Sequence, residues 1–587
     1  MELKILTREE AGKLEKDEII IPYGYTVLEG NLFSGKKRSR ITSITITDSV
    51  TTVCNEAFNN CKLLTTIHIP ENVTMIGENV FARCKSLIEI SVDEDNPNYS
   101  SVDGILYNKN KTKLIQCPEG KVGSVTIPDS AIEIGDNAFF YCNLIVSIQL
   151  PEGVLHIGKN AFRYCTSLID IAIPKNVKSI DNNAFAFCKS LTNISILCNV
   201  ASIGRNLFIS CSSLANITIP NGITIAKGTP SLSFLGCKSL KTVFIGDGIT
   251  TIDDCEFDTL RNERFEYCNA LTVIVIDPNN PKYSSKDGVL FNKDMTTLLR
   301  FPKGKSGEYI IPDSVTTIEC RAFKDCCSLV NITIPNSVTT IGDCAFKGCL
   351  ELREIIIPNS VTFIGDSVFD EGITNITIPA SVKYLSPWAF YSCSSLTAIV
   401  VDEQNPVYSS VDGVLFNKNK TLLIRYPAKK VGAYSIPYSV SCIGNSAFAF
   451  CEFLTNIDIP NSVIDIRKNA FYACISLESV SIPNGITIIR EETFESCIAL
   501  ASVTIPDSVT IIDGGSFAGC ESLESILLPD NVLKIQCSAF VYCNSLTKAI
   551  YKGKIYSVVN DSHDLNLPQD FYDTINGKDE LHNIFEV

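Results

Sequence analysis

The chain is poor in the residues from which most active sites are built. Its 587 residues include four histidines, three methionines and a single tryptophan. No histidine forms an evident pair with a serine or cysteine nucleophile, and neither a Gly-rich phosphate loop nor a His-Glu-x-x-His motif occurs. We therefore expect a non-catalytic protein with no catalytic residues, no cofactor and no metal site.

The chain also lacks long apolar runs and an excess of basic residues. No run approaches the about 18 apolar residues of a membrane-spanning helix, so we expect no transmembrane segment. The segment up to Pro22 is charged throughout, unlike a signal peptide, which predicts a cytoplasmic location. A net charge of −15 disfavours nucleic acid and anionic membranes as partners, because both require a basic surface.

Paired Cys-x-x-Cys motifs are missing as well, although the chain has 25 cysteines. Sixteen of them occupy one position of a repeating pattern, and the other nine are scattered. A free cysteine behaves as a small, buried hydrophobic residue. One cysteine per repeat at the same phase predicts a packed column of reduced thiols, because stacked parallel side chains do not match disulfide geometry.

The dominant feature that is present is a period of 23 residues, marked by a phenylalanine with a cysteine three positions later. The pairs Phe139/Cys142, Phe162/Cys165 and Phe185/Cys188 show the spacing, which continues through most of the chain. A fixed period of this size indicates one small unit stacked on itself. The sequence therefore predicts an α/β repeat solenoid with a continuous core rather than several globular domains.

The unit from Leu329 to Cys349, LVNITIPNSVTTIGDCAFKGC, shows how one coil should fold. Its first residues alternate between apolar and polar as in a half-buried strand, and Pro335 ends that strand. Asp343 is placed to cap a short helical turn, and Phe346 should fill the back of the coil. Strands on one side and bulky turns on the other should curve the stack, with a parallel concave sheet and convex helical turns.

The ends of the chain depart from the repeat. We expect an N-terminal helical cap over residues 1–18, because Thr7 and Glu10 have capping-box spacing. The solenoid should then span residues 19–548, followed by a C-terminal hairpin and helix cap over 549–587. The hairpin should turn at 552–554, and the helix should run between Pro568 and Gly577. Such caps protect the terminal strand edges of a solenoid.

Three inserts lengthen the period to 58 residues, at about 93–121, 277–305 and 402–430. Each contains two apolar runs around a polar turn, which predicts a hairpin. The inserts should share one conformation, with equivalent bends at 103–104, 287–288 and 412–413. The acidic opening of the first insert, Asp93 to Asp95, lacks calcium-loop spacing, and the other copies lose acidic residues, so we expect no metal site there.

The outward-facing strand position changes character along the chain. It is mostly Ser or Thr near both ends, includes one carboxylate (Asp458), and contains no Lys or Arg. In the middle it becomes apolar, and the candidate partner-binding residues are Phe244, Val275, Ile310, Ile356 and Val400. An exposed apolar strip would bind a protein. The alternative is that the insert hairpins cover part of it, because Val275 and Val400 adjoin inserts.

The pattern L-x-x-I-x-I-P-x-x-V-x-x-I-G-x-x-A-F-x-x-C, carried by Leu329–Cys349 and Leu454–Cys474, resembles the BspA-like leucine-rich repeats of bacteria and some protozoa. The resemblance covers roughly residues 19–548 and implies a right-handed leucine-rich-repeat solenoid. Members of that family are often surface proteins linked to adhesion, coaggregation and binding of host matrix proteins. The family defines no catalytic residues, and the resemblance implies a cell-surface or secreted location.

These observations favour a non-catalytic protein-binding scaffold, such as a bacterial adhesin, that binds through its concave strand face. Its partner would be an unidentified protein, such as a host matrix or cell-surface protein, and the chain would be monomeric. The alternatives are a solenoid carbohydrate-active enzyme and an intracellular interaction scaffold. The enzyme would need several acidic or basic residues clustered on adjacent coils of one face, which the outward strand position does not supply.

Overall fold

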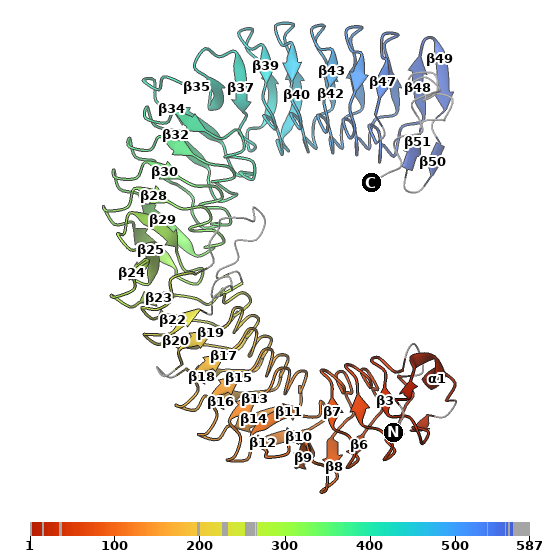
Figure 1. The fold of residues 1–587 in the computed structure, drawn as a ribbon. Helices are drawn as coiled ribbons and strands as arrows, with labels where there is room; N and C mark the ends of the chain where they lie inside the picture. Colours follow the sequence, from red (N-terminus) through yellow and green to blue (C-terminus); the bar gives the residue numbers. More distant parts are fainter. Residues whose placement is uncertain are drawn as a thin grey trace. The chain divides into compact units, whose positions relative to one another are not determined.

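The computed structural model describes residues 3–14, 17–33, 38–196, 200–225, 233–252, 265, 267–536, 538–557, 559–561 and 564–566. The chain forms two compact units. Figure 1 shows the stacked strands within each of them. Unit 1 comprises residues 1–294 and 302–304, and unit 2 comprises residues 295–301 and 305–587. The boundary falls within the second insert. Both units are built from the same kind of coil.

A typical coil contains one long strand of three to five residues and one short strand of two residues. Each kind pairs in parallel with its counterpart in the neighbouring coil, so the same position of the repeat recurs in register. Ile148 pairs with Ile171 in the long strands, and Ile157 pairs with Ile180 in the short strands. The fold is thus a solenoid of stacked parallel strands.

The long strands are β2 (Glu18–Ile20), β4 (Ser43–Thr45), β6 (Thr66–Ile69), β8 (Glu89–Val92), β12 (Gly123–Thr126), β14 (Ile145–Gln149), β16 (Asp170–Ala172), β18 (Asn193–Ser195), β20 (Asn216–Ile219), β22 (Thr242–Ile245), β23 (Val273–Ile276), β27 (Gly307–Ile310), β29 (Leu329–Thr333), β32 (Asn375–Ile378), β34 (Ala398–Val401), β38 (Gly432–Ser435), β40 (Leu454–Asp458), β42 (Ser479–Ser481), β44 (Ser502–Thr504), β46 (Ser525–Leu527) and β48 (Lys548–Tyr551).

The short strands are β1 (Ile5–Leu6), β3 (Val27–Leu28), β5 (Thr52–Val53), β7 (Met75–Ile76), β13 (Glu133–Ile134), β15 (His156–Ile157), β17 (Ser179–Ile180), β19 (Ser202–Ile203), β21 (Thr224–Ile225), β28 (Thr317–Ile318), β30 (Thr340–Ile341), β31 (Phe363–Ile364), β33 (Tyr384–Leu385), β39 (Cys442–Ile443), β41 (Asp465–Ile466), β43 (Ile488–Ile489), β45 (Ile511–Ile512) and β47 (Lys534–Ile535).

The core of each unit lies between its long strands, short strands and turns. In β29 the buried Ile332 alternates with the exposed Asn331 and Thr333, as the strand period requires. The phenylalanines of successive coils stack inside, with ring centroids 5.2 Å apart both for Phe139–Phe162 and for Phe162–Phe185. Because every coil presents the same side chain at the same height, the core is continuous along the stack.

The segments after the short strands are turns, and the prediction of short helical turns is wrong. α1 (Arg8–Gly12) is the single α-helix among the described residues, so the α/β class is wrong as well. Two residues of most such turns have positive φ, for example Asn160 at 55° and Tyr164 at 66°. An α-helix requires negative φ at every residue, so these positions interrupt it. Asp343 does not cap its own turn, because its Oδ1 accepts from Asp366 N of the next coil at 2.8 Å.

The 22 described cysteines are all free, and those of the repeat column are buried. Their thiols also have a regular hydrogen-bond partner. Cys165, Cys188 and Cys211 each donate at 3.1 Å to the carbonyl of the phenylalanine one coil earlier in the stack. The cysteine column is therefore a ladder of weak S–H donors that satisfies buried turn carbonyls.

Each insert contains antiparallel strands: β9 (Tyr99–Val102), β10 (Ile105–Asn108) and β11 (Lys113–Gln116); β24 (Tyr283–Lys286), β25 (Val289–Asn292) and β26 (Thr297–Arg300); and β35 (Tyr408–Val411), β36 (Val414–Asn417) and β37 (Leu422–Arg425). β9 pairs antiparallel with β10, and β24 and β35 do so with β25 and β36. Their tips turn at Asp103, Asp287 and Asp412, with φ between 49° and 52°.

The inserts end the preceding sheets by supplying partners to their free edges. In the first insert, Ile90 N of β8 donates to Gly104 O, and Ile76 N of β7 donates to the Tyr99 hydroxyl, both at 2.9 Å. Asn96 is fully buried, and its side chain donates to Pro70 O and accepts from Tyr99 N. Asn280 and Asn405 occupy the same position in the other inserts and are also fully buried.

The described chain ends also have their own structures. Thr7 and Glu10 form a capping box at the start of α1. At the other end, β48 pairs antiparallel with β49 (Lys554–Ser557), and β50 (Val559–Asp561) pairs with β51 (Asp564–Asn566). The helix expected between 568 and 577 lies outside the described residues. Within those residues, no helix is long and apolar enough to cross a membrane.

Candidate functional site

Four of the five residues proposed from the sequence lie on the outward face of long strands, and Ile356 holds the same repeat position in the segment 352–358, which forms no strand. Side chains of a strand alternate between its two faces, so the repeat position of Thr333 points away from the buried Ile332. Parallel pairing in register then places one such residue per coil in a column. The five candidate residues hold this outward position of the repeat, and they are divided between the two units.

Unit 1 contains Phe244 and Val275, which lie side by side. They pair directly in the ladder between β22 and β23, and Phe244 is preceded by Thr218 of β20. Both side chains are half-buried. Together they make a small apolar surface at the last regular coils before the second insert.

Unit 2 contains Ile310, Ile356 and Val400, which are 73%, 74% and 50% exposed. They belong to alternate coils of the stack. Thr333 pairs with Ile310, and Thr377 pairs with Val400, so each threonine lies next to an apolar neighbour. We call Ile310, Ile356 and Val400 with the intervening Thr333 and Thr377 the apolar column of unit 2.

The third insert does not hide this column. Its tip lies against β34, where Ile399 N donates to Gly413 O at 2.9 Å. Val400, the next residue of that strand, nevertheless keeps half of its surface exposed. Ile310 and Ile356 are more exposed still. In unit 2, therefore, the alternative in which the hairpins cover the strip does not describe the structure.

A second outward column runs beside the first, and the sequence reasoning missed it. Residues two positions apart in a strand share a face, so Glu308 and Ile310 both point outward from β27. Glu354 lies two residues before Ile356 in the segment without a strand, and both glutamates are exposed. The signal was present as the repeated spacing Glu-x-Ile, but it becomes evident only when both faces of the strand are followed.

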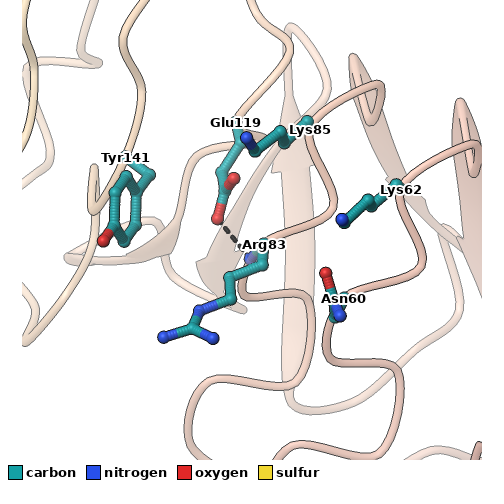
Figure 2. Close-up of a pocket in the computed structure, with 6 residues that line it drawn as sticks. All are labelled: Asn60, Lys62, Arg83, Lys85, Glu119 and Tyr141. Atoms are coloured by element: carbon teal, nitrogen blue, oxygen red, sulfur yellow. Dashed lines mark hydrogen bonds between the residues drawn. The ribbon is translucent and has the colours of Figure 1, made fainter. Parts of the chain in front are cut away.

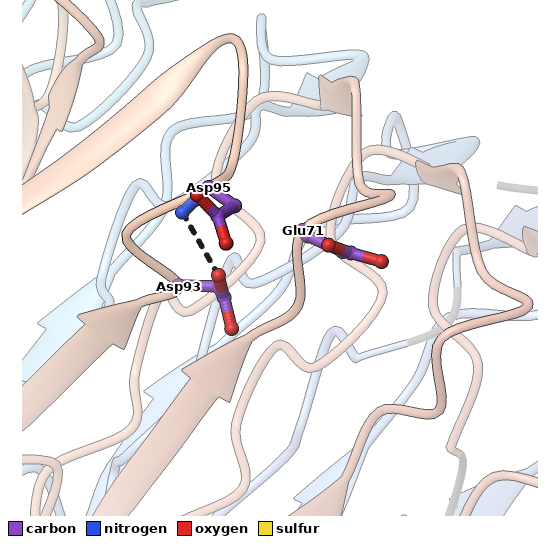
Figure 3. A group of neighbouring side chains, drawn as sticks. All are labelled: Glu71, Asp93 and Asp95. Atoms are coloured by element: carbon purple, nitrogen blue, oxygen red, sulfur yellow. Dashed lines mark hydrogen bonds between the residues drawn. The ribbon is translucent and has the colours of Figure 1, made fainter.

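Three carboxylates at the start of the first insert also lie close together (Figure 3). The ligand oxygens of Glu71, Asp93 and Asp95 lie within 4.8 Å of one another. Asp93 Oδ1 accepts from Asp95 N at 2.9 Å, and the His68 ring lies 4.0 Å from the same carboxylate. The group is mostly exposed.

The same turn occurs in the other inserts without the cluster. Asp277 and Asp402 accept from the backbone N–H two residues later, each at 2.8 Å, but those residues are Asn279 and Gln404. The aspartate at this position therefore forms a turn. The acidic group is explained by that role and is assigned no metal.

The repeat pattern of the BspA-type leucine-rich repeat region matches residues 12–120, 117–229, 301–422 and 426–560. The chain belongs to this family. The match covers most of both units, and it confirms the resemblance that the sequence pattern indicated. Members of this family are built as repeat scaffolds, in agreement with the stacked parallel strands of the BspA-type chain described here.

Several solved bacterial structures are similar to this BspA-type chain. A leucine-rich cell surface protein from Faecalibacterium prausnitzii is 27% identical, with 79% of this chain and 97% of that chain covered and a TM-score of 0.35. A leucine-rich repeat protein from Eubacterium ventriosum is 22% identical, with coverage of 78% and 99% and a TM-score of 0.37. The pneumococcal vaccine antigen PcpA is 16% identical, with coverage of 81% and 84% and a TM-score of 0.31. No curated protein matches the chain.

Proposed function

We propose that this protein is a non-catalytic protein-binding scaffold, and that the outward long-strand face of unit 2 binds its partner. A bacterial adhesin that binds a host matrix or cell-surface protein fits this proposal best. The observation that carries it is the exposure of Ile310 and Ile356 on a face where the intervening coils carry Thr333 and Thr377. Large apolar side chains in such a position are typical of interaction surfaces.

The surface also suggests the chemistry of the partner. Ile310 and Ile356 lie on alternate coils, with Thr333 at the same repeat position of the coil between them. Each isoleucine has an exposed glutamate two residues earlier, Glu308 and Glu354. A partner segment with apolar side chains at this spacing and Lys or Arg beside them would complement both columns. The apolar contacts would supply most of the affinity, and the charges would favour the correct register.

An enzymatic role has less support on this face. General acid–base hydrolysis of a glycosidic bond requires two carboxyl groups facing each other. The outward column contains one carboxylate, Asp458, which pairs in register with Ser435. An intracellular scaffold would use the same face with a different partner. The binding experiment below distinguishes it from an adhesin, because only an adhesin should bind extracellular-matrix proteins.

The test replaces Ile310 and Ile356 together by threonine, the residue that the intervening coils carry at the same position. The outward side chains contribute little to the core, so the double variant should keep its melting temperature. Binding to immobilised extracellular-matrix proteins, measured by biolayer interferometry, should weaken at least about tenfold, or about 1.4 kcal/mol.

The matched control is Leu527→Thr, because Leu527 belongs to the same outward column and is 63% exposed at the far end of unit 2. This variant should bind like the unaltered chain. Equal affinity of the double variant and the unaltered chain would remove the apolar column from the proposal. Absence of binding to any matrix protein would reject the adhesin role itself.

A further inference from the structure

A pocket opens in unit 1 on the side of the turns (Figure 2). Its volume is about 280 Å³, and its lining residues are Asn60, Lys62, Arg83, Lys85, Glu119 and Tyr141. Asn60, Arg83 and Tyr141 hold the same repeat position in successive turns, and each has a positive φ. Glu119 comes from the end of the first insert. The pocket therefore exists because an insert interrupts the regular series of turns.

Glu119 replaces a backbone carbonyl that the insert has displaced. In regular coils the N–H at this turn position donates to a carbonyl of the next coil, as Asn60 N does to Ala82 O at 2.8 Å. The coil after Arg83 is displaced by the insert, and Arg83 N donates to the Glu119 carboxyl instead. Glu119 is 4% exposed, and burial raises its pKa to about 7.

The other inserts show that their fold does not require a carboxyl group here. Pro118 is followed by Glu119, whereas Pro302 is followed by Lys303 and Pro427 by Ala428. A structural role common to the three inserts therefore does not account for the glutamate. The buried carboxyl is a feature of the first insert alone.

Three cations gather at this pocket in a chain whose net charge is −15. Lys62 and Lys85 directly follow the column cysteines of two consecutive coils, and Arg83 lies between them in the sequence. All three side chains are exposed, and none forms a salt bridge with another residue of the described ranges. Their charge is available to an anionic ligand.

Tyr141 forms the end of an aromatic stack at the edge of the pocket. Its ring lies parallel to that of Tyr164 at 4.5 Å, and the Tyr164 ring lies 4.5 Å from that of Phe187. These three residues have φ of 64° to 66°, a conformation that bulky residues seldom adopt. Figure 2 shows the Tyr141 ring on the opposite side of the pocket from Lys62 and Lys85. The stack holds one aromatic ring rigidly beside three cations.

We propose that this pocket binds a carboxylated sugar residue of the hexuronic acid class, as found in acidic glycans. Lys62, Arg83 and Lys85 would hold the sugar carboxylate by charge-assisted hydrogen bonds. Asn60 and Glu119 would exchange hydrogen bonds with ring hydroxyls, and the Tyr141 ring would contact the apolar face of the sugar. The volume suits a single sugar ring. This site is separate from the protein-binding face and goes beyond the proposed scaffold function.

Binding should also depend on pH. The charged and titratable groups around Glu119 are Lys62, Arg83 and Lys85 in front, Tyr141 beside it, and the thiols of Cys84 and Cys142 behind it. Below pH 7 the Glu119 carboxyl is neutral and does not repel a ligand carboxylate. We therefore expect the affinity for a uronate to fall as the pH rises from 6 to 8, and Glu119→Gln to remove this dependence.

The test measures binding of galacturonic acid and of a short oligogalacturonate to the full chain by ligand-observed NMR and calorimetry. Galactose and inorganic phosphate are the comparison ligands. Arg83→Asn and Lys85→Gln should each weaken uronate binding at least about tenfold, and asparagine suits the positive φ of position 83. Lys189→Ala is the matched control, because Lys189 also follows a column cysteine but lies outside the pocket.

The proposal is supported if the uronates bind at least about tenfold more tightly than galactose and phosphate and if only the pocket variants lose affinity. Phosphate binding as tight as uronate binding would show a simple anion site and would overturn the sugar assignment. Equal losses in Lys189→Ala and the pocket variants would place the binding elsewhere. Absence of uronate binding by the unaltered chain would also overturn the proposal, and it would leave the matrix-protein assay unaffected.

Discussion

At the scale of single residues, the cysteine column shows what a repeat position can and cannot reveal. The spacing of Phe and Cys predicted buried, unpaired thiols, and the described cysteines of the column are buried and free. The spacing did not reveal that Cys474 and Cys497 donate to Phe448 O and Phe471 O, each one coil back in the stack. The phase of a residue follows from the period, but its partner depends on how two coils stack.

The buried thiols should make the protein sensitive to alkali. Burial raises the pKa of Cys165 and Cys188 well above the usual value and that of Cys393 and Cys451 to about 12. The pKa of a cysteine thiol in an unfolded chain is about 8.5. The contribution of these groups to the free energy of unfolding is therefore complete below that pH and is lost as the pH rises toward the folded-state pKa. Each thiol should lower the stability by about 1.4 kcal/mol per pH unit.

Urea midpoints measured between pH 8 and pH 10 check this expectation. The midpoint should fall steeply for the unaltered chain and less steeply for Cys165→Ala with Cys188→Ala. In Cys327→Ala the urea midpoint should fall as steeply as in the unaltered chain, because Cys327 is the one exposed cysteine among the described residues. A midpoint that stays constant over this pH range would show that the column thiols are accessible to water.

At the scale of elements, the inserts were visible in the sequence, but their role was not. Asn405 is fully buried, and it donates to Pro379 O and Val382 O while it accepts from Val407 N and Tyr408 N. It thereby supplies the hydrogen bonds that a further coil would have made. Reading this from the sequence would require the register between the insert and the preceding coil, which no local pattern contains.

Asn405→Leu should destabilise the junction between the third insert and the preceding coils. The change removes the side-chain partner of Val382 O, Val407 N and Tyr408 N, while Pro379 O keeps its bond from Val382 N, and each buried group left unpaired costs about 1–3 kcal/mol. Partial relaxation should limit the total to roughly 3–5 kcal/mol. Hydrogen exchange should show local opening of β33 to β36, because each coil depends on its neighbours.

Asn419→Leu is the control for this experiment, because Asn419 is exposed at the turn of the same hairpin. It should leave the exchange of β33 to β36 unchanged. If both variants lost the same protection, the insert would be sensitive to any apolar substitution. If neither did, the hydrogen bonds of Asn405 would not hold the junction.

The turns are the element that sequence reasoning misjudged. A spacing of three between Phe162 and Cys165 is compatible with a helical turn, and nothing in the residue types at Tyr164 suggests a positive φ. The backbone there follows from hydrogen bonds to the next coil, such as Tyr164 N to Ala186 O at 3.0 Å. Contacts between coils override the local preference. The pocket around Glu119 was missed for the same reason, since its residues come from several turns.

At the scale of the whole molecule, the period predicted the stacked architecture, and the family match agrees with it. The phase of the period predicts that Ile310 and Ile356 point outward, and both are exposed, but their role in binding stays a prediction. It could not show that Phe244 and Val275 belong to a different compact unit, because the sequence pattern continues across the boundary. The candidate protein-binding site is therefore best defined by the exposed apolar column of unit 2.

The most direct test of the proposed function is hydroxyl-radical footprinting of the chain, free and bound to the matrix protein that it binds best. Oxidation of Ile310, Ile356 and Val400 should fall at least about threefold in the complex, because an interface excludes water from its anchors. Leu527, exposed on the same column at the far end of unit 2, should be oxidised equally in both states. Unchanged oxidation of Ile310 and Ile356 in the complex would contradict the proposal that the partner binds the apolar column of unit 2.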